Sequence, residues 1–457
     1  MDLYGRLFRG LLHPAWESGI RRRPTLRHLR ELKRSQWWSE DELHALQCRE
    51  LERLVRHAYR HVPLYRARFE AAGLAEGDVR TPADLARLPI LTRDEARDQA
   101  RERESVVPPL PSLRKQTSGT TGQPLLFGYE PASEHFRQAV KLRAYEWAGY
   151  RPGDKALFFW GAPLPHAPPL TTRAKIALDR RLKRERHVPC AVMTVERLRE
   201  VVRAIERERP QVLVCYAQAG AELARFVNQE RLRRWDTLPV ICGAERLLAH
   251  DRADLMKAFG EAVFDTYGCR EVMLIGSECA AHQGLHLAME NVIVEIVVTE
   301  ADGKKRAAQP GEVGEVVLTD LHNLGMPFIR YANGDVAVAG ERERCPCGRG
   351  LLRIRSVEGR SSETLRDGRG AAVSGLALSF LFHDIAGAVR QFQAIQHRDR
   401  SVTINLVLSQ PLSAETLDSV RAHGARLLEG VAVEVRTVAE LPRNPAGKHN
   451  LVVVERG

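Results

Sequence analysis

A stretch of glycines and hydroxyl side chains at residues 116–125, QTSGTTGQPL, is the first segment that could carry chemistry. Glycines let backbone N–H groups come close to an anion, and serine and threonine hydroxyls add further donors. The segment is therefore a candidate phosphate-binding loop. It differs from the GxxxxGK[ST] nucleotide loop because no Lys-Ser or Lys-Thr pair follows its second glycine. Taken alone, such a segment is more often a plain surface turn.

Three later segments add charged and aromatic residues: DTYGCRE, ending at Glu271, MPFIRYANGD, ending at Asp335, and LPRNPAGKHN, which holds Lys448. HAYRHVPLYRARF and LARLPILTRDEAR stand nearer the N-terminus. In this order and with these separations, the segments resemble the adenylate-forming (acyl-AMP-forming) ligase superfamily. Within it, the sequence is similar to the phenylacetate–coenzyme A ligase family, including its CapK-like branch, over nearly the whole chain.

The resemblance implies ATP and Mg²⁺ as cofactors and assigns a role to each segment. The β- and γ-phosphates are held by Ser118, Gly119, Thr120, Thr121 and Gly122. The adenine lies between Tyr267 with Gly268 on one side and Gly243, Ala244 and Glu245 on the other. The ribose hydroxyls bind Asp335, and Arg360 contacts ribose or phosphate near an interdomain hinge.

Two of the implied residues act on the reacting groups. Lys448 neutralises charge on the attacking carboxylate and the α-phosphate, since a point charge on a long stem can move in and out of a site. Glu271 is the Mg²⁺ ligand, because a hard cation that bridges phosphates prefers carboxylate oxygen. The commonest family pattern has threonine or serine before this glutamate. Here Arg270 stands there, as in the CapK-like branch, and adds positive charge near the phosphates or the acyl group.

Cysteines and histidines form a second candidate site. Cys345 and Cys347 stand one residue apart in ERCPCGRG, and SECAAHQGLH offers Cys279, His282 and His286. Three thiolates and an imidazole can bind a structural Zn²⁺ in a closed tetrahedral set, although C-x-C is tighter than the usual spacing. Members of the resembled family carry a similar group, and their GLH segment matches His286. The preferred set is Cys279, His286, Cys345 and Cys347, with His282 as a substitute, and the alternative is free thiols on a loop.

These residues must be positioned by an α/β (α+β) fold. Residues 25–105 show helical spacing, and Ser39 is placed to begin a helix. From about 140 to 270, strand-length apolar runs such as QVLVCYA alternate with amphipathic helices such as VERLREVVRAIERERP, which favours a layered α/β domain. Strands and one helix in the last hundred residues predict a small α+β domain, and the resemblance implies that this domain is mobile. The expected boundaries are 1–359 for the large ATP- and acid-binding domain and 360–457 for the small domain that carries the lysine.

Composition narrows the class of protein. The chain has 457 residues and a net charge of +11. Its arginines are spread along the chain, and the clusters RRRP and RRLKRER are interpreted as solvated helix faces without the aromatics of a nucleic-acid platform. No apolar run predicts a membrane span, and no secretory signal is evident. Eight cysteines without an export signal favour a reducing cytoplasm. The oligomeric state stays open, with a homodimer as one option.

Four functions follow from these features. The first is an ATP-dependent ligase that makes an acyl-adenylate from a small carboxylic acid, releases pyrophosphate and passes the acyl group to coenzyme A. The second is a CapK-like enzyme that passes the acyl or AMP group to an amine or hydroxyl in polysaccharide or natural-product biosynthesis. A catalytically silent nucleotide-binding protein is disfavoured by the presence of Glu271 and Lys448. A nucleic-acid-binding protein is disfavoured by the absence of a basic–aromatic platform.

Overall fold

The computed structural model describes residues 2–111, 113–116, 125–161, 169–190, 194–300, 302–360, 364–368, 372–374, 378, 380–385, 388–442 and 452–455. The chain divides into two compact units. The first comprises residues 1–333 and 338–356, and the second comprises residues 334–337 and 357–457. The main segment of the second unit therefore starts beside the expected boundary at residues 359–360.

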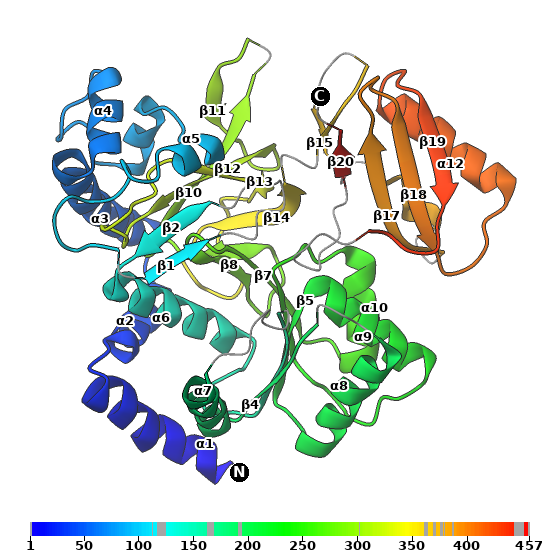
Figure 1. Ribbon diagram of the computed structural model, residues 1–457, viewed down its shortest axis with the longest axis horizontal. Helices are drawn as coiled ribbons and strands as arrows, with labels where there is room; N and C mark the ends of the chain where they lie inside the picture. Colours follow the sequence, from blue (N-terminus) through cyan, green and yellow to red (C-terminus); the bar gives the residue numbers. More distant parts are fainter. Residues whose placement is uncertain are drawn as a thin grey trace. The chain divides into compact units, whose positions relative to one another are not determined.

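Helices dominate the first hundred residues, as their apolar spacing predicts (Figure 1). They are α1 (Leu3–Leu7), the π-helical segments η1 (Phe8–Leu12) and η2 (Ala15–Ile20), α2 (Thr25–Ser35), α3 (Glu40–His61), α4 (Pro63–Ala71), the 3₁₀ segment η3 (Pro82–Arg87) and α5 (Arg93–Asp98). The start of α3 at Ser39 is confirmed: its side chain accepts a hydrogen bond from the Glu42 N–H, and the Glu42 carboxylate accepts one from the Ser39 N–H. This reciprocal pair is a capping box.

A twelve-stranded sheet follows and carries the expected α/β pattern. Its strand order is β11 (Lys305–Ala307), β10 (Val292–Thr299), β12 (Val313–Asp320), β13 (Tyr331–Ala339), β14 (Arg353–Arg360), β9 (Leu285–Leu287), β8 (Met273–Glu278), β7 (Val263–Cys269), β6 (Val240–Gly243), β5 (Val212–Tyr216), β3 (Ala156–Phe159) and β4 (Glu185–Val188). Strands β4, β3, β5, β6 and β7 are parallel, whereas β7 pairs with β8 in the antiparallel sense. Strand direction thus reverses at β7.

Helices cover both faces of the parallel strands. On one face, α8 (Val195–Glu208), α9 (Ala217–Gln229) and α10 (Ala249–Phe259) enclose a core that includes Leu213 and Cys215 of β5 (Figure 1). On the other face, Val212 and Val214 pack with Tyr145 of α6 (Pro131–Trp147). Because successive side chains of a strand point to opposite faces, a strand covered on both sides is apolar throughout. This explains why QVLVCYA reads as an unbroken apolar run.

The second unit has its own sheet and core. Four strands are ordered β19 (Val433–Thr437), β18 (Val402–Leu408), β17 (Val389–Gln396) and β20 (Val452–Val454). They pack with α12 (Ala414–Leu427) and the short segment η5 (Phe380–Ile385), beside a hairpin of β15 (Thr364–Arg366) and β16 (Ala372–Ser374). The predicted strands and helix of the small domain are confirmed. Among the described residues, no helix is long and apolar enough to cross a bilayer.

Candidate functional site

The glycine-rich segment connects two paired strands. β1 (Leu113–Gln116) runs antiparallel to β2 (Leu126–Tyr129), with Gln116 opposite Leu126. The predicted phosphate-binding residues 118–122 lie outside the described residues, so their role stays a prediction. Their two flanks are held side by side by the strand pairing. In addition, Arg270 Nη1 donates a 2.8 Å hydrogen bond to the carbonyl of Gln116, which places this exposed arginine at the entrance of the segment.

The predicted metal ligand Glu271 is buried, with 3% of its surface exposed. Its Oε1 accepts hydrogen bonds from Arg93 Nη1 at 3.0 Å and from the Tyr331 hydroxyl at 3.1 Å. Its Oε2 receives no hydrogen bond from any residue that the structure describes. Burial opposes the charge of Arg93, but Tyr331 and Glu271 outweigh it and raise the pKa of the guanidinium. The result is a fixed carboxylate with one oxygen available for a cation.

The backbone of Glu271 is also fixed. Arg137 on α6 donates from Nη1 to the Glu271 carbonyl at 2.8 Å, and its Nη2 bonds the carboxylate of Asp320 at the end of β12. Both members of this second pair are fully buried. Sequence reasoning assigned no role to Arg93, Tyr331 or Arg137. Arg93 and Tyr331 do lie in LARLPILTRDEAR and MPFIRYANGD, two of the segments that carry the family resemblance.

The predicted adenine wall lies on β7. Tyr267 is largely buried, and its hydroxyl accepts a 2.9 Å hydrogen bond from Asn333 Nδ2. The register of β7 against β8 shifts between Tyr267 and Gly268. A Cβ at Gly268 would lie 2.3 Å from the Met273 carbonyl oxygen, so only glycine fits without moving the backbone. Tyr267, Gly268, Arg270 and Glu271 thus belong to one strand end and the turn that follows it.

The opposite wall, Gly243–Glu245, leaves the carboxyl end of β6. Ala244 has a φ of +65°, a left-handed conformation that turns the chain away from the strand. A Cβ at Gly243 would lie 2.6 Å from Thr266 Oγ1 and 3.3 Å from the Trp160 ring. The Glu245 carboxylate accepts a hydrogen bond from the backbone N–H of Gln218. Carboxyl ends of parallel strands are the usual ligand-binding edge of an α/β sheet.

The other predicted nucleotide contacts are less fully described. Asp335 is a half-buried residue of β13, in the short segment 334–337 that groups with the second unit. Arg360 ends β14, and its side chain lies outside the described residues. Lys448 also lies outside them. The roles assigned to these three residues stay predictions.

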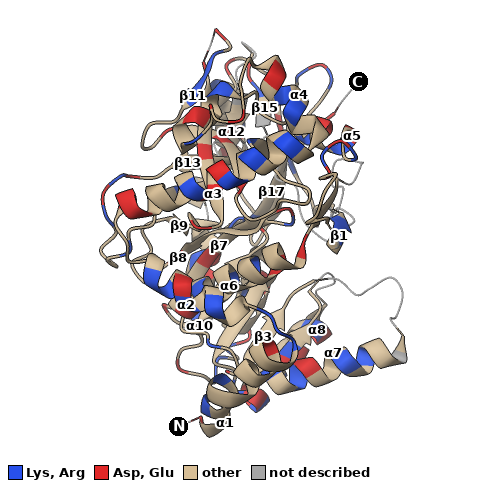
Figure 2. Ribbon diagram, turned by 90° about the vertical axis from the view of Figure 1, so that its left-hand side faces the viewer, with Lys and Arg blue, Asp and Glu red and all other residues tan. Residues whose placement is uncertain are grey.

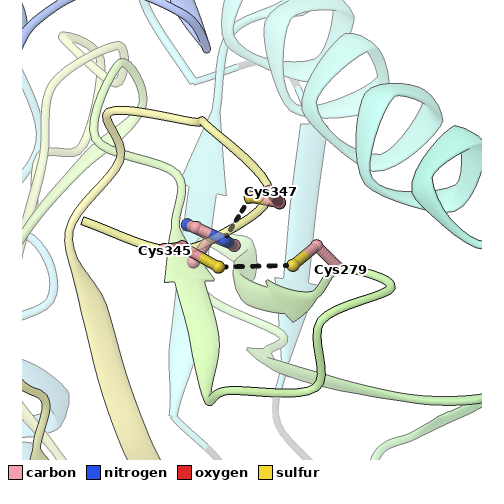
Figure 3. A group of neighbouring side chains, drawn as sticks. Cys279, Cys345 and Cys347 are labelled. Carbon is pink, nitrogen blue, oxygen red and sulfur yellow. Dashed lines mark hydrogen bonds between the residues drawn. The ribbon is translucent and has the colours of Figure 1, made fainter. Parts of the chain in front are cut away.

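The structure brings all four preferred metal-binding residues together. The ligand atoms of Cys279, His286, Cys345 and Cys347 lie within 4.8 Å of one another. The sulfurs of Cys279 and Cys345 are 3.7 Å apart, and Cys347 Sγ lies 3.3 Å from His286 Nε2 (Figure 3). Two sulfurs bound to a tetrahedral zinc are about 3.8 Å apart when each Zn–S bond is about 2.3 Å. The substitute, His282, contacts the Glu278 carboxylate instead.

The surroundings of this cluster suit metal ligands. His286 is buried, and its Nδ1 lies 3.1 Å from the Leu351 carbonyl, which leaves Nε2 facing Cys347. Burial lowers the pKa of His286 to about 4, so the ring is neutral near neutral pH. Burial disfavours ionisation of Cys347, but hydrogen bonds from Arg349, Cys345 and Cys279 together outweigh it and lower the pKa of that thiol. A neutral imidazole and an accessible thiolate are the forms that bind zinc.

Comparisons with known proteins agree with this architecture. The model of the CapK C-terminal domain matches residues 365–455. The phenylacetate–coenzyme A ligase of Thermus thermophilus is 28% identical over 387 residues, covering 82% of this chain and 83% of that protein. The Escherichia coli phenylacetate–coenzyme A ligase is 28% identical over 332 residues, covering 72% and 73%. The crystal structure of a 2-hydroxyisobutyryl-CoA ligase superimposes with a TM-score of 0.71 at 18% identity, over 93% of this chain and 92% of that one.

The layered sheet, the ligand-binding edge and the small C-terminal domain define the fold of an adenylate-forming ligase. The resemblance seen in the sequence is confirmed by the comparisons. The chain has this fold, is similar to the phenylacetate–coenzyme A ligases over most of its length, and matches the CapK C-terminal domain over residues 365–455.

Proposed function

We propose that the protein is an ATP-dependent acid–coenzyme A ligase. The observation that carries this proposal is the buried Glu271 carboxylate, which accepts hydrogen bonds from Arg93 and Tyr331. The preceding residue, Arg270, donates a hydrogen bond to the Gln116 carbonyl at the entrance of the glycine-rich segment. This turn lies at the reversal point of the sheet, where phosphates, metal and base can meet. Relatives named as coenzyme A ligases over most of the chain support the same assignment.

In the first half-reaction, a carboxylate oxygen of the acid attacks the α-phosphorus of ATP. The P–O bond to the β-phosphate breaks, and pyrophosphate leaves with the electron pair. Lys448 neutralises the charge that gathers on the carboxylate and α-phosphate, while residues 118–122 hold the departing phosphates. Glu271 Oε2 would hold Mg²⁺, which supplies charge neutralisation for the phosphates when bound. Tyr267 and Gly243 position the adenine.

In the second half-reaction, the thiol sulfur of coenzyme A attacks the acyl carbon and AMP leaves, giving the thioester. The acid would lie near Trp160 and Tyr216, which meet edge to face with ring centroids 4.5 Å apart beside Gly243. Both side chains leave the carboxyl ends of parallel strands. Their flat apolar surfaces favour an aromatic or otherwise apolar acid.

The match of residues 365–455 to the CapK C-terminal domain favours a second candidate. In it, adenylation is unchanged, but the acyl or AMP group passes to an amine or hydroxyl acceptor in polysaccharide or natural-product biosynthesis. The acceptor, and not the first half-reaction, therefore separates the two candidates.

We further propose that Cys279, His286, Cys345 and Cys347 hold a structural Zn²⁺. Four protein ligands leave no open position for water, so such an ion would stabilise the loops before β9 and β14 without taking part in catalysis. Because none of the eight cysteines forms a disulfide and ATP and coenzyme A are the proposed substrates, the expected compartment is a reducing cytoplasm.

The direct test is pyrophosphate release from ATP and Mg²⁺ with a panel of aryl, fatty and amino acids, with and without coenzyme A. Acid-dependent release, with a thioester formed only when coenzyme A is present, is the expected result. Lys448→Ala should abolish release while ATP still binds, whereas the exposed control Lys304→Ala should behave as wild type. A normal rate in Lys448→Ala would refute the lysine assignment. Release that is indifferent to coenzyme A would favour the CapK-like candidate.

A further inference from the structure

The N-terminal helical segment, residues 3–20, turns its apolar side chains outward. Phe8 and Glu17 are buried on its inner side. The exposed large apolar residues are Leu3 (76%), Leu7 (50%), Leu11 (59%), Leu12 (39%), Trp16 (43%) and Ile20 (68%). Scattered exposed leucines are normal, but a row of six along one helical segment marks a docking surface.

This segment packs beside α7 (Leu170–Lys183) and its C-terminal cap. The Tyr4 hydroxyl donates to the Leu182 carbonyl at 2.7 Å, and Arg184 pairs with Asp2 at 2.5 Å. The α7 helix itself exposes Leu178 and Leu182. Figure 2 shows lysine and arginine residues along α7. The apolar row therefore borders a basic helix.

A basic pocket of about 410 Å³ lies at the same corner. Its cations are Lys155, Arg180, Arg181, Arg184, Arg186 and Arg207, against two acids, Glu185 and Glu208. Arg184 joins the two features, since it lines the pocket and also holds Asp2. The pocket includes Ala156 and Glu185, the first residues of β3 and β4. The pocket thus lies at the amino ends of the parallel strands, whereas Tyr216 and Gly243 lie at their carboxyl ends. The proposed ligase chemistry does not use this pocket.

The positive charge of the surface formed by residues 3–20, α7 and the pocket favours an anionic partner over a second copy of the chain. Between residues 2 and 23 the only acids are Asp2 and Glu17, and each is paired with an arginine, Arg184 and Arg23. Arg180 and Arg181 are exposed and form no ion pair with any described residue. A symmetric contact between two copies would bring like charges together, because the six cations of the pocket outnumber its two acids. An anionic surface would offset them.

We propose that this face docks onto an anionic phospholipid bilayer. The leucines and Trp16 enter the interface between headgroups and acyl chains, while the pocket cations meet lipid phosphates. An exposed apolar helix face flanked by arginine, with tryptophan at its edge, has the composition of helices that lie in the membrane plane. The attachment is peripheral and reversible, and it leaves the opposite edge of the sheet open to soluble ligands.

The test is co-sedimentation of the full chain with vesicles of phosphatidylcholine alone and of phosphatidylcholine mixed with phosphatidylglycerol. Binding to the anionic vesicles, weakened by salt, is expected. The double variants Leu7→Glu/Leu11→Glu and Arg180→Glu/Arg181→Glu should each lower the bound fraction about tenfold. Val313→Glu, at an equally exposed apolar position on β12, is the matched control and should bind as wild type. Circular dichroism checks that each variant is folded.

Four results would overturn the proposal. The first is equal binding to both vesicle types, and the second is binding to neither. Another is a dimer in sedimentation velocity that Leu7→Glu/Leu11→Glu dissociates, because the apolar row would then be covered by a second copy. The last is binding of inorganic phosphate by the pocket without vesicle binding, which would make it a site for a soluble anion. Pyrophosphate release measured without vesicles is a separate readout, so failure of the ligase assignment is distinguishable.

Discussion

Gly268→Ala should damage the turn that carries the candidate nucleotide residues. The added Cβ would lie 2.3 Å from the Met273 carbonyl oxygen and 3.2 Å from the Leu274 Cα. An ordinary carbon–oxygen contact is about 3.4 Å, so the overlap is about 1 Å. Both atoms are backbone and cannot rotate away, and β7 and β8 must separate locally. Overpacking of this kind costs about 1–3 kcal/mol.

Gly243→Ala provides a graded comparison. Its added Cβ would first meet Thr266 Oγ1, at 2.6 Å, which is the end of a side chain that donates to the Cys242 carbonyl. Rotation of that hydroxyl relieves the overlap at the loss of one hydrogen bond, about 1 kcal/mol. Gly77→Ala is the control, because its only contact is the Arg80 guanidinium at 3.4 Å. The expected order of destabilisation is Gly268, then Gly243, then Gly77.

The assay combines thermal unfolding with the KM for ATP in acid-dependent pyrophosphate release. The melting temperature of Gly268→Ala should fall by a few degrees, at about 2 °C per kcal/mol. Its KM for ATP should also rise, because displacement of Met273 moves Tyr267 and Glu271. This rise should exceed any change in KM that the small loss of stability alone would cause. A variant with unchanged melting temperature and KM would refute the reasoning that this glycine is required by close backbone approach.

Three further predictions concern the metal and the buried charges. Protein purified without chelator should contain about one zinc per chain, lost in Cys345→Ser but not in Cys48→Ser, and absence of zinc from the wild type would contradict the site. Burial and the neighbouring Glu278 raise the pKa of Asp265 to about 8. Between about pH 4 and that pKa, the carboxyl is ionised in the unfolded chain and protonated in the folded one, so the free energy of unfolding should fall as pH rises through this range. Asp265→Asn should flatten this slope in urea unfolding measured below and above that pKa, and an unchanged slope would exclude Asp265 as its source. Arg143→Met should lower the free energy of unfolding in urea by about 3–5 kcal/mol, because the buried Glu290 carboxylate loses its ion pair and keeps the hydrogen bond from the Ser35 hydroxyl. The exposed control Arg27→Met should lower the free energy of unfolding by less than about 1 kcal/mol. A similar decrease in both variants would contradict the argument.

Local features of the fold were predictable because they depend on neighbours in the sequence. Ser39 caps α3 through Glu42, three residues away, and α8 ends just before Pro210. The strand β5 is an apolar run because both of its faces are covered. In the same way, Tyr267 and Glu271 could be assigned together, since one short turn contains both.

Contacts between distant segments could not be read in this way. Arg93 reaches Glu271 across 178 residues, and Arg137 reaches it across 134. No spacing rule connects such positions, because they meet only after the strand order of the sheet is set. The metal cluster shows the same effect: His286 and Cys347 are 61 residues apart and meet because β9 pairs with β14. The residue types indicate a zinc site, whereas the close C-x-C spacing alone is only suggestive.

The basic cluster at residues 180–186 shows that local composition does not predict which cations meet in the folded chain. The local sequence predicts that its arginines are solvated residues of a helix face. In the structure, Arg180 and Arg181 are exposed, as that interpretation requires, but they line one pocket together with Lys155 and Arg207 from other elements. Convergence of cations from separate strands and helices depends on topology and leaves no mark on a local stretch of sequence.

The turn that follows β7 has a consequence for how the protein can change over evolution. Under the proposed function, base stacking, phosphate charge and metal binding all depend on five consecutive residues, 267–271. A substitution that shifts this turn alters the three properties together, so base preference and metal dependence cannot be tuned one at a time. Arg93 and Arg137 fix the turn from outside through their hydrogen bonds to Glu271, so a change at either residue is expected to shift the same turn. Transplanting nucleotide specificity between relatives would therefore require the turn and its two arginines to move together.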